Sequence, residues 1–271
     1  MKLVAAAVAA LAALGGGCVE WGVVGDGTSV SVGRASDGLL VDGVAVPASG
    51  PGFWTPPRWR ARGSGWGTDE LVTLIADVGR AVAAAAPGAR VGVADLSRAG
   101  GGLGRFHRSH QSGRDVDLLF FATDLAGRPV ELTEMRHFGE DGVTHDGGPP
   151  LRFDAARTWL VVRALLTAAG PGVEYLFIFD PLRQQLLDHA RAIGEPASLI
   201  DWAGARLAQP GDSAPHDDHL HVRIGCPVGD AACRDSGRAQ AKKPSQPTAA
   251  IARALAAQPI VGSPWLRGPR F

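Results

Sequence analysis

The stretch that decides the fold is His219-Leu220-His221-Val222-Arg223-Ile224, near the C-terminal end of the chain. Polar and apolar residues alternate along it, which is typical of a β-strand that buries one face. His219 and His221 then share the other face about 7 Å apart, given a rise of ~3.3 Å per residue. Two imidazoles on one face are costly to desolvate unless a partner compensates them, and a metal ion would be such a partner.

A second stretch with the same residue types, His107-Arg108-Ser109-His110-Gln111-Ser112-Gly113-Arg114-Asp115-Val116-Asp117, precedes it in the chain. With His216 included, the two regions hold five of the eight histidines. Gly113 lets the chain turn between His110 and Asp117, and residues 115–121 are predicted to form a buried strand. A catalytic zinc takes three nitrogen or oxygen ligands and keeps one position for water. We therefore expect zinc bound by His110, Asp117 and His221.

In this arrangement His219 is the general base that takes a proton from zinc-bound water. Asp115 either replaces Asp117 as a ligand or supports a histidine ligand from behind. An HxH or HxxH pattern alone is weak, but both together on predicted neighbouring strands favour a metal site. The alternative is a structural site closed by four protein ligands. Three further histidines are expected on the surface or in loops: His137, His145 and His189.

The composition of the 271 residues is that of an ordinary globular protein, with 45% hydrophobic and 20% charged residues. The formal net charge is zero. No broad positive field is therefore available to hold a polyanion, and nucleic acid is excluded as a partner.

The N-terminus predicts export. Lys2 precedes an apolar run from Leu3 to Leu14, and Gly15-Gly16-Gly17 then precede Cys18. This run is shorter than the roughly 20 residues of a spanning helix, so residues 1–18 are predicted to be a cleaved signal peptide. Cys18 resembles the lipidation site of bacterial lipoproteins, although Gly15 stands where that pattern usually has Leu. The protein is expected in the periplasm or cell envelope, either lipid-anchored through Cys18 or secreted without an anchor.

Export changes the interpretation of the other two cysteines. Cys226 and Cys233 are close in sequence and flank Pro227 and Gly229. In an oxidising compartment they are predicted to form a disulfide. Zinc ligation by these cysteines is the weaker alternative, because neither a CxxC spacing nor a second pair is present.

The chain is predicted to form a single α+β domain, with a central, mostly antiparallel sheet flanked by helices. Thr68 should cap a helix that ends near Pro87, and Asp154 one that ends near Gly170. Further helices are expected over 181–193 and 197–207, and strands over 90–96, 115–121, 173–179 and 219–224. Residues 19–67 are expected to be an irregular Gly/Pro-rich lead with a hairpin, 68–235 the domain that carries the zinc site, and 236–271 a loosely ordered tail.

The two histidine stretches together resemble the penicillin-insensitive murein endopeptidases, which belong to a wider group of zinc peptidases with lysostaphin, D-alanyl-D-alanine peptidases and hedgehog domains. The similarity covers Thr68 to Cys233 and includes Phe153-Asp154-Ala155-Ala156-Arg157-Thr158-Trp159. It implies the same zinc ligands and His219 as base. It also implies that His216 stabilises the tetrahedral intermediate and that His107 lines the site.

The implied reaction is hydrolysis of an amide in peptidoglycan cross-links, typically between D-alanine and diaminopimelate. A D-Ala-D-Ala carboxypeptidase or dipeptidase is the nearest alternative, but that branch usually has Glu as base where this chain has His219. The other alternative is a zinc-bearing cell-wall binding module that has lost catalysis. Because both His216 and His219 are present, the sequence shows no cause for such a loss.

Overall fold

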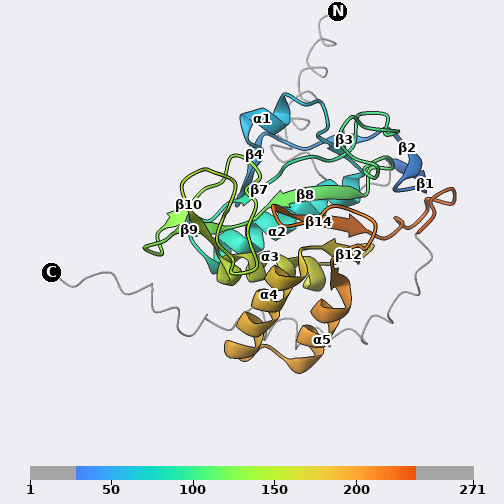
Figure 1. Cartoon of the computed structure of the whole chain (residues 1–271). Coiled ribbons are helices and arrows are strands. Elements are labelled where there is room, and N and C mark those ends of the chain that lie inside the picture. The colour runs from blue at the N-terminus through green and yellow to red at the C-terminus, as the bar shows by residue number, and fades with distance from the viewer. Residues whose placement is uncertain (1–28, 236–271) are drawn as a thin grey trace, which may run out of the picture.

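A computed structural model of the protein describes residues 29–235 (Figure 1). The predicted signal peptide, Cys18 and the tail from Ser236 lie outside the described residues. Within residues 29–235, no helix has both the length and the apolar character needed to cross a membrane.

The central sheet has four strands in the order β13-β12-β14-β8. They are β8 (Asp115–Leu119), β12 (Val173–Phe177), β13 (Leu207–Ala208) and β14 (His219–Ile224). β14 runs antiparallel to both β8 and β12, while β12 and β13 are parallel. The predicted mostly antiparallel sheet is therefore confirmed. Its register sets the chemistry, because His221 lies opposite Asp117 and Arg223 lies opposite Asp115.

Four long helices support the sheet: α2 (Asp69–Ala85), α3 (Ala155–Thr167), α4 (Asp180–Ala192) and α5 (Ala197–Arg206). The side chains of Thr68 and Asp154 cap α2 and α3 as predicted, each accepting a hydrogen bond from a backbone N–H three residues on. The apolar face of β14 joins the core that these helices form, with Leu220, Val222 and Ile224 buried. Because side chains alternate along a strand, His219 and His221 lie on the opposite face of β14.

The strand that was expected over residues 90–96 is shorter in the structure. Of residues 90–96, only β7 (Val91–Gly92) is a strand. β7 pairs with β5 (Phe53–Trp54). Only the chain beyond β7 pairs with β8, where Ala94 N–H donates to Asp117 O and Asp117 N–H donates to Asp95 O. β8 is thus paired along both edges, which explains why all five of its residues are buried.

The remaining elements are short and surround this sheet. β1 (Val30–Arg34) and β2 (Asp37–Val41) form the expected hairpin. The others are β3 (Val44–Ala45), β4 (Ser49–Gly50), β5 (Phe53–Trp54), α1 (Pro57–Arg60), β6 (Trp66–Gly67), β9 (Ala122–Asp124), β10 (Pro129–Val130) and β11 (Leu151–Phe153).

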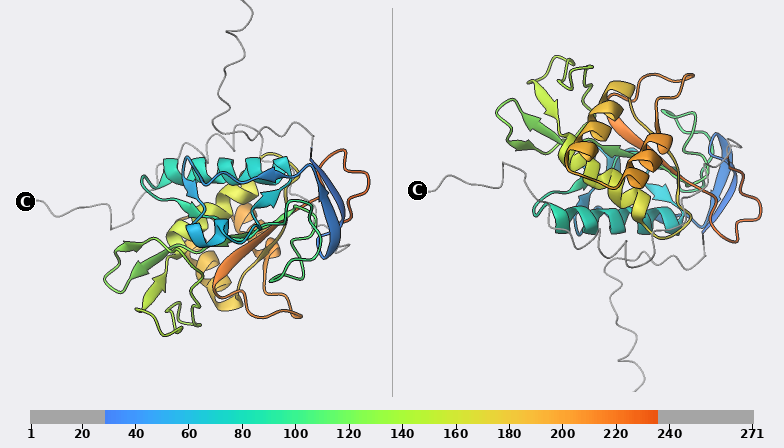
Figure 2. Two further views of the ribbon diagram at one scale, coloured as in Figure 1. Left: turned by 90° about the horizontal axis from the view of Figure 1, so that it is seen from above. Right: turned by 90° about the horizontal axis from the view of Figure 1, so that it is seen from below.

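The loop after β14 is closed by a Cys226–Cys233 disulfide, as predicted. This loop pairs with β1, since Gly33 N–H donates to Ala232 O and Arg234 N–H donates to Gly33 O. Both views of Figure 2 show the loop beside the hairpin. The end of β14 is thereby fixed to the N-terminal part of the described chain.

Candidate active site

The loop before β8 carries His110 in an unusual backbone conformation. His110 has φ 63°, in the left-handed region that non-glycine residues seldom adopt. Gln111 holds the loop in place, because its N–H donates to Ala35 O and its side-chain amide donates to Ser36 O. Gly113 has φ 76°, and a Cβ there would lie 2.6 Å from Leu40 Cδ1. These restraints direct the buried His110 side chain toward β8 and β14.

Three side-chain atoms from different parts of the chain meet at this point. His110 Nε2 lies 3.3 Å from Asp117 Oδ1 and 3.2 Å from His221 Nδ1. His221 Nδ1 lies 3.0 Å from Asp117 Oδ1. The sequence predicted these three residues as a ligand set, and the structure brings them together. All three are buried.

Asp115 orients the ring of His221. His221 Nε2 lies 2.9 Å from Asp115 Oδ1, which also accepts a hydrogen bond from Arg223 Nε at 2.6 Å. Burial raises the pKa of Asp115, but Arg223 and His221 outweigh burial and hold it well below its usual range. The ionised carboxylate therefore accepts the Nε2 proton, and the Nδ1 lone pair of His221 points at Asp117. Two roles were predicted for Asp115, metal ligand or support of a histidine ligand. The geometry matches the second, because Asp115 contacts the His221 ring nitrogen that faces away from Asp117.

This donor set fits a metal ion. In the tautomer that Asp115 favours, His221 Nδ1 and Asp117 Oδ1 are both hydrogen-bond acceptors, and a cation between them would satisfy both. Ligand atoms around a tetrahedral zinc are roughly 3.4 Å apart, given bonds of about 2.0–2.1 Å. The observed separations of 3.0, 3.2 and 3.3 Å are close to this value. Within the described chain, Asp117 Oδ2 has no hydrogen-bond partner, although His107 Nε2 lies 3.6 Å from it.

The charge on Asp117 is preserved despite burial. Burial raises the pKa of this carboxyl, but the neighbouring His110 and His219 lower it well below its usual value. The carboxylate is therefore ionised at neutral pH, as a metal ligand must be.

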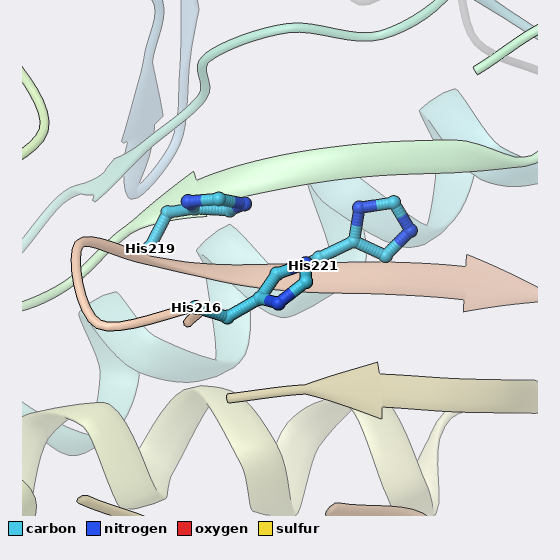
Figure 3. Close-up of side chains that lie close together, drawn as sticks. All are labelled: His216, His219 and His221. Carbon is cyan, nitrogen blue, oxygen red and sulfur yellow. The ribbon is translucent and has the colours of Figure 1, made fainter. Parts of the chain in front are cut away.

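His219 and His216 border the three-atom cluster on one side. His219 Nε2 lies 3.4 Å from Asp117 Oδ1, and its ring centroid lies 5.1 Å from that of His216. Figure 3 shows both imidazoles with His221 on the same side of β14, with helical ribbon behind the strand. Burial and the adjacent His219 and His221 lower the pKa of His216 to about 4. His216 is therefore neutral at neutral pH.

His107 lies at the opposite edge, where its ring centroid is 4.3 Å from that of His110. Its Nε2 lies 2.8 Å from Oδ2 of the buried Asp95, which also contacts Arg62 Nη1 at 3.1 Å. Sequence reasoning did not single out Asp95. The available indication was an acidic residue directly after the apolar alternation of residues 90–94.

The three remaining histidines lie outside this cluster. His137 and His145 are exposed, with 51% and 61% of the side chain accessible, in agreement with the sequence-based expectation. His137 Nδ1 lies 2.8 Å from Asp217 Oδ1, an ordinary ion-pair distance. His189 lies on α4 and is partly buried, and burial lowers its pKa.

Comparison with known proteins identifies the family of this chain. A family model described as penicillin-insensitive murein endopeptidase matches residues 31–250. The chain belongs to this family. It is accordingly an enzyme of the peptidase class. The match begins well before Thr68, so the similarity is broader than the range Thr68–Cys233 that the motifs indicated.

Individual relatives agree with the family match, and each bears the name penicillin-insensitive murein endopeptidase. The protein from Klebsiella pneumoniae subsp. pneumoniae is 28% identical over 212 residues, covering 77% of this chain and 71% of the relative. That from Haemophilus influenzae is 27% identical over 224 residues, covering 78% and 68%. That from Escherichia coli O1:K1 / APEC is 26% identical over 213 residues, covering 77% and 71%.

Proposed function

We propose that this protein is a zinc-dependent endopeptidase that hydrolyses amide bonds in the peptide cross-links of peptidoglycan, of the D-alanyl-diaminopimelate type. The observation that supports this most directly is the meeting of His110 Nε2, Asp117 Oδ1 and His221 Nδ1 within 3.3 Å of one another. Membership of a family named for murein endopeptidase activity supports the substrate class.

His110, Asp117 and His221 would hold the ion. A zinc ion bound there supplies Lewis acidity toward a carbonyl oxygen and lowers the pKa of a water molecule. Two neutral histidines and one aspartate leave a net charge near +1, so the site still attracts the carbonyl oxygen of an amide.

His219 is proposed as the general base. Its Nε2 lies 3.4 Å from Asp117 Oδ1, at the edge of the ligand cluster, so a water molecule beside Asp117 is within its reach. His219 would accept a proton from this water as it attacks the amide carbon, and would return a proton to the departing amine.

His216 is proposed to stabilise the negative charge that develops on the carbonyl oxygen. With its pKa lowered to about 4, the ring is neutral at neutral pH and can donate one N–H hydrogen bond to an oxyanion. His107 is proposed to line the opposite edge of the site, held there by Asp95.

The test is digestion of purified sacculi and of defined cross-linked muropeptide dimers, with products identified by mass spectrometry. We expect dimers to become monomers with a newly free diaminopimelate amino group. A chelator should abolish the reaction and added zinc should restore it. Intact dimers with shortened stems would instead indicate the carboxypeptidase alternative, and bound but unaltered sacculi would indicate a binding module.

The predicted export agrees with this substrate, because peptidoglycan lies in the cell envelope. We propose that residues 1–18 direct export, and that Cys18 is either lipidated or removed with the signal peptide. Mass spectrometry of the mature N-terminus from cells distinguishes the two: a diacylated Cys18 supports anchoring, and an unmodified downstream N-terminus supports secretion.

A further inference from the structure

The loop that leads into β14 brings a carboxylate against the proposed general base. His219 Nδ1 lies 2.5 Å from Oδ1 of Asp218, the residue that precedes it in the chain. The opposite ring nitrogen, Nε2, faces Asp117 Oδ1. His219 is therefore held between two carboxylates, one among the proposed metal ligands and one behind it.

The backbone around Asp218 is fixed by the rest of the fold. His216 N–H donates to Gln209 Oε1, and Phe179 N–H donates to His216 O. Phe138 N–H donates to Asp217 O. The main chain immediately before Asp218 is thus anchored from three sides, and β14 begins at His219. Because these hydrogen bonds fix the backbone, the fold itself holds the Asp218 carboxylate against the His219 ring.

Asp218 and His219 are also shielded from solvent, with 15% and 14% of their side chains accessible. Hydrogen bonds to a charged group are strongest where water does not compete. A carboxylate only accepts hydrogen bonds, so the contact with Asp218 favours the His219 tautomer with the proton on Nδ1. With a metal ion bound at Asp117, the Nε2 lone pair in that tautomer would point toward the ion and could accept a proton from water.

We propose that Asp218 is a positioning residue that holds His219 with Nδ1 protonated and Nε2 directed at the ligand cluster formed by His110, Asp117 and His221. The expected effect on catalysis rests on the proposed function, because only a general base needs a free lone pair on Nε2 of His219. Its structural part, the tautomer and ring orientation, does not depend on the reaction.

The neighbouring Asp217 provides a matched control. It carries the same charge and is as accessible as Asp218, at 15%. Its carboxylate pairs with His137 Nδ1 at 2.8 Å and lies 3.9 Å from His145 Nε2, and no contact with His219 is found among the described residues. Asp217→Asn therefore removes one charge from the same loop without touching the proposed base.

The experiment compares Asp218→Asn with Asp217→Asn in the full-length protein saturated with zinc. An aspartate that orients a histidine base in a serine protease is worth about 10⁴-fold in kcat, but that carboxylate is buried. Since general-base catalysis supplies about 10²- to 10⁴-fold and Asn keeps an acceptor oxygen, we expect Asp218→Asn to lower kcat on cross-linked dimers about 10- to 100-fold. KM and bound zinc should not change, and Asp217→Asn should match the unsubstituted protein.

The second readout is the ¹⁵N and ¹H resonances of the His219 ring. With zinc bound, the unsubstituted protein should show a proton on Nδ1 and a free Nε2, and Asp218→Asn should shift the ring toward the other tautomer or a mixture. Equal kcat for the two variants, or a proton on Nε2 in the unsubstituted protein, would overturn the inference. If the unsubstituted protein cleaves no dimer, the proposed function fails, and the tautomer alone still decides the role of Asp218.

Discussion

Two clusters of histidine and aspartate lie close together in this molecule, and they differ in kind. Around Asp117, two imidazole nitrogens and a carboxylate oxygen lie within 3.3 Å of one another in the interior. Around Asp217, the half-exposed His137 forms an ordinary donor-acceptor pair, and His145 stays 3.9 Å away. Each cluster contains a group whose possible ligand atoms lie close enough to share a metal ion: His107, His110 and Asp117 in the first, and His137, Asp217 and Asp218 in the second.

The difference lies in what satisfies the polar atoms. At Asp217 the imidazole N–H and the carboxylate oxygen satisfy each other, and water reaches the remaining atoms. At Asp117 the orientation of His221 is already determined by Asp115, and in the tautomer that Asp115 favours two acceptors face each other. Burial and mismatched acceptors, more than residue composition, identify the cluster that needs a cation.

The largest expected effect is the loss of a ligand. Asp117→Asn or His221→Ala should abolish zinc binding and lower dimer cleavage by more than about 100-fold, since even residues behind a ligand are worth about 10- to 100-fold. His137→Ala, in the other cluster, should retain both. Zinc content by mass spectrometry and a cleavage assay measure this. Full zinc content in the Asp117 and His221 variants would show that the cluster around Asp117 is not the zinc site.

The next effect separates binding from chemistry within the first cluster. His219→Ala should lower kcat by about 10²- to 10⁴-fold, the usual contribution of a general base, while bound zinc remains stoichiometric. Steady-state kinetics and metal analysis of the same preparation test this. Unchanged turnover would reject His219 as the base, and lost zinc would instead make it a ligand.

A smaller effect is expected from removing the charge of Asp115, which supports a ligand without binding the ion itself. Asp115→Asn should weaken zinc affinity by about 10- to 100-fold, because His221 loses the charged acceptor of its Nε2 proton. Titration against a competing chelator measures the affinity. Asp124→Asn, which affects an accessible carboxylate on β9 paired with Arg128, is the matched control and should not change it. Equal affinities for the two variants would show that Asp115 does not support His221.

The smallest effect concerns the exposed cluster. The hydrogen bond to Asp217 raises the pKa of His137 from 6.5, so the protonated ring stabilises the folded state. This contribution is fully present below about pH 6.5 and is lost as the pH rises through the higher folded-state pKa. Exposed ion pairs contribute about 0.2–1 kcal/mol. Urea unfolding of the protein and of His137→Ala should therefore differ slightly at pH 6 and converge in alkaline solution; a gap that widens with pH would contradict the assignment.

Much of the framework could be predicted from local patterns. The alternation of residues 219–224 placed three polar side chains opposite three buried aliphatic ones, and Thr68 and Asp154 were recognisable as helix caps. These features depend on interactions within a few residues. The strand expected over 90–96 was shorter than predicted, because β7 pairs with β5 only over Val91–Gly92, and the chain beyond it contacts β8 through an isolated bridge and single hydrogen bonds.

The sequence by itself determined which residue types were available: imidazoles and carboxylates in two short stretches, one of them on an alternating strand. Only the tertiary structure decided how they act. The antiparallel register sets His221 opposite Asp117, and the side-chain contacts place Asp115 behind the ring and Asp218 behind His219. The reason is physical: a ligand cluster depends on distances of about 3 Å between segments a hundred residues apart, and no local preference encodes such distances.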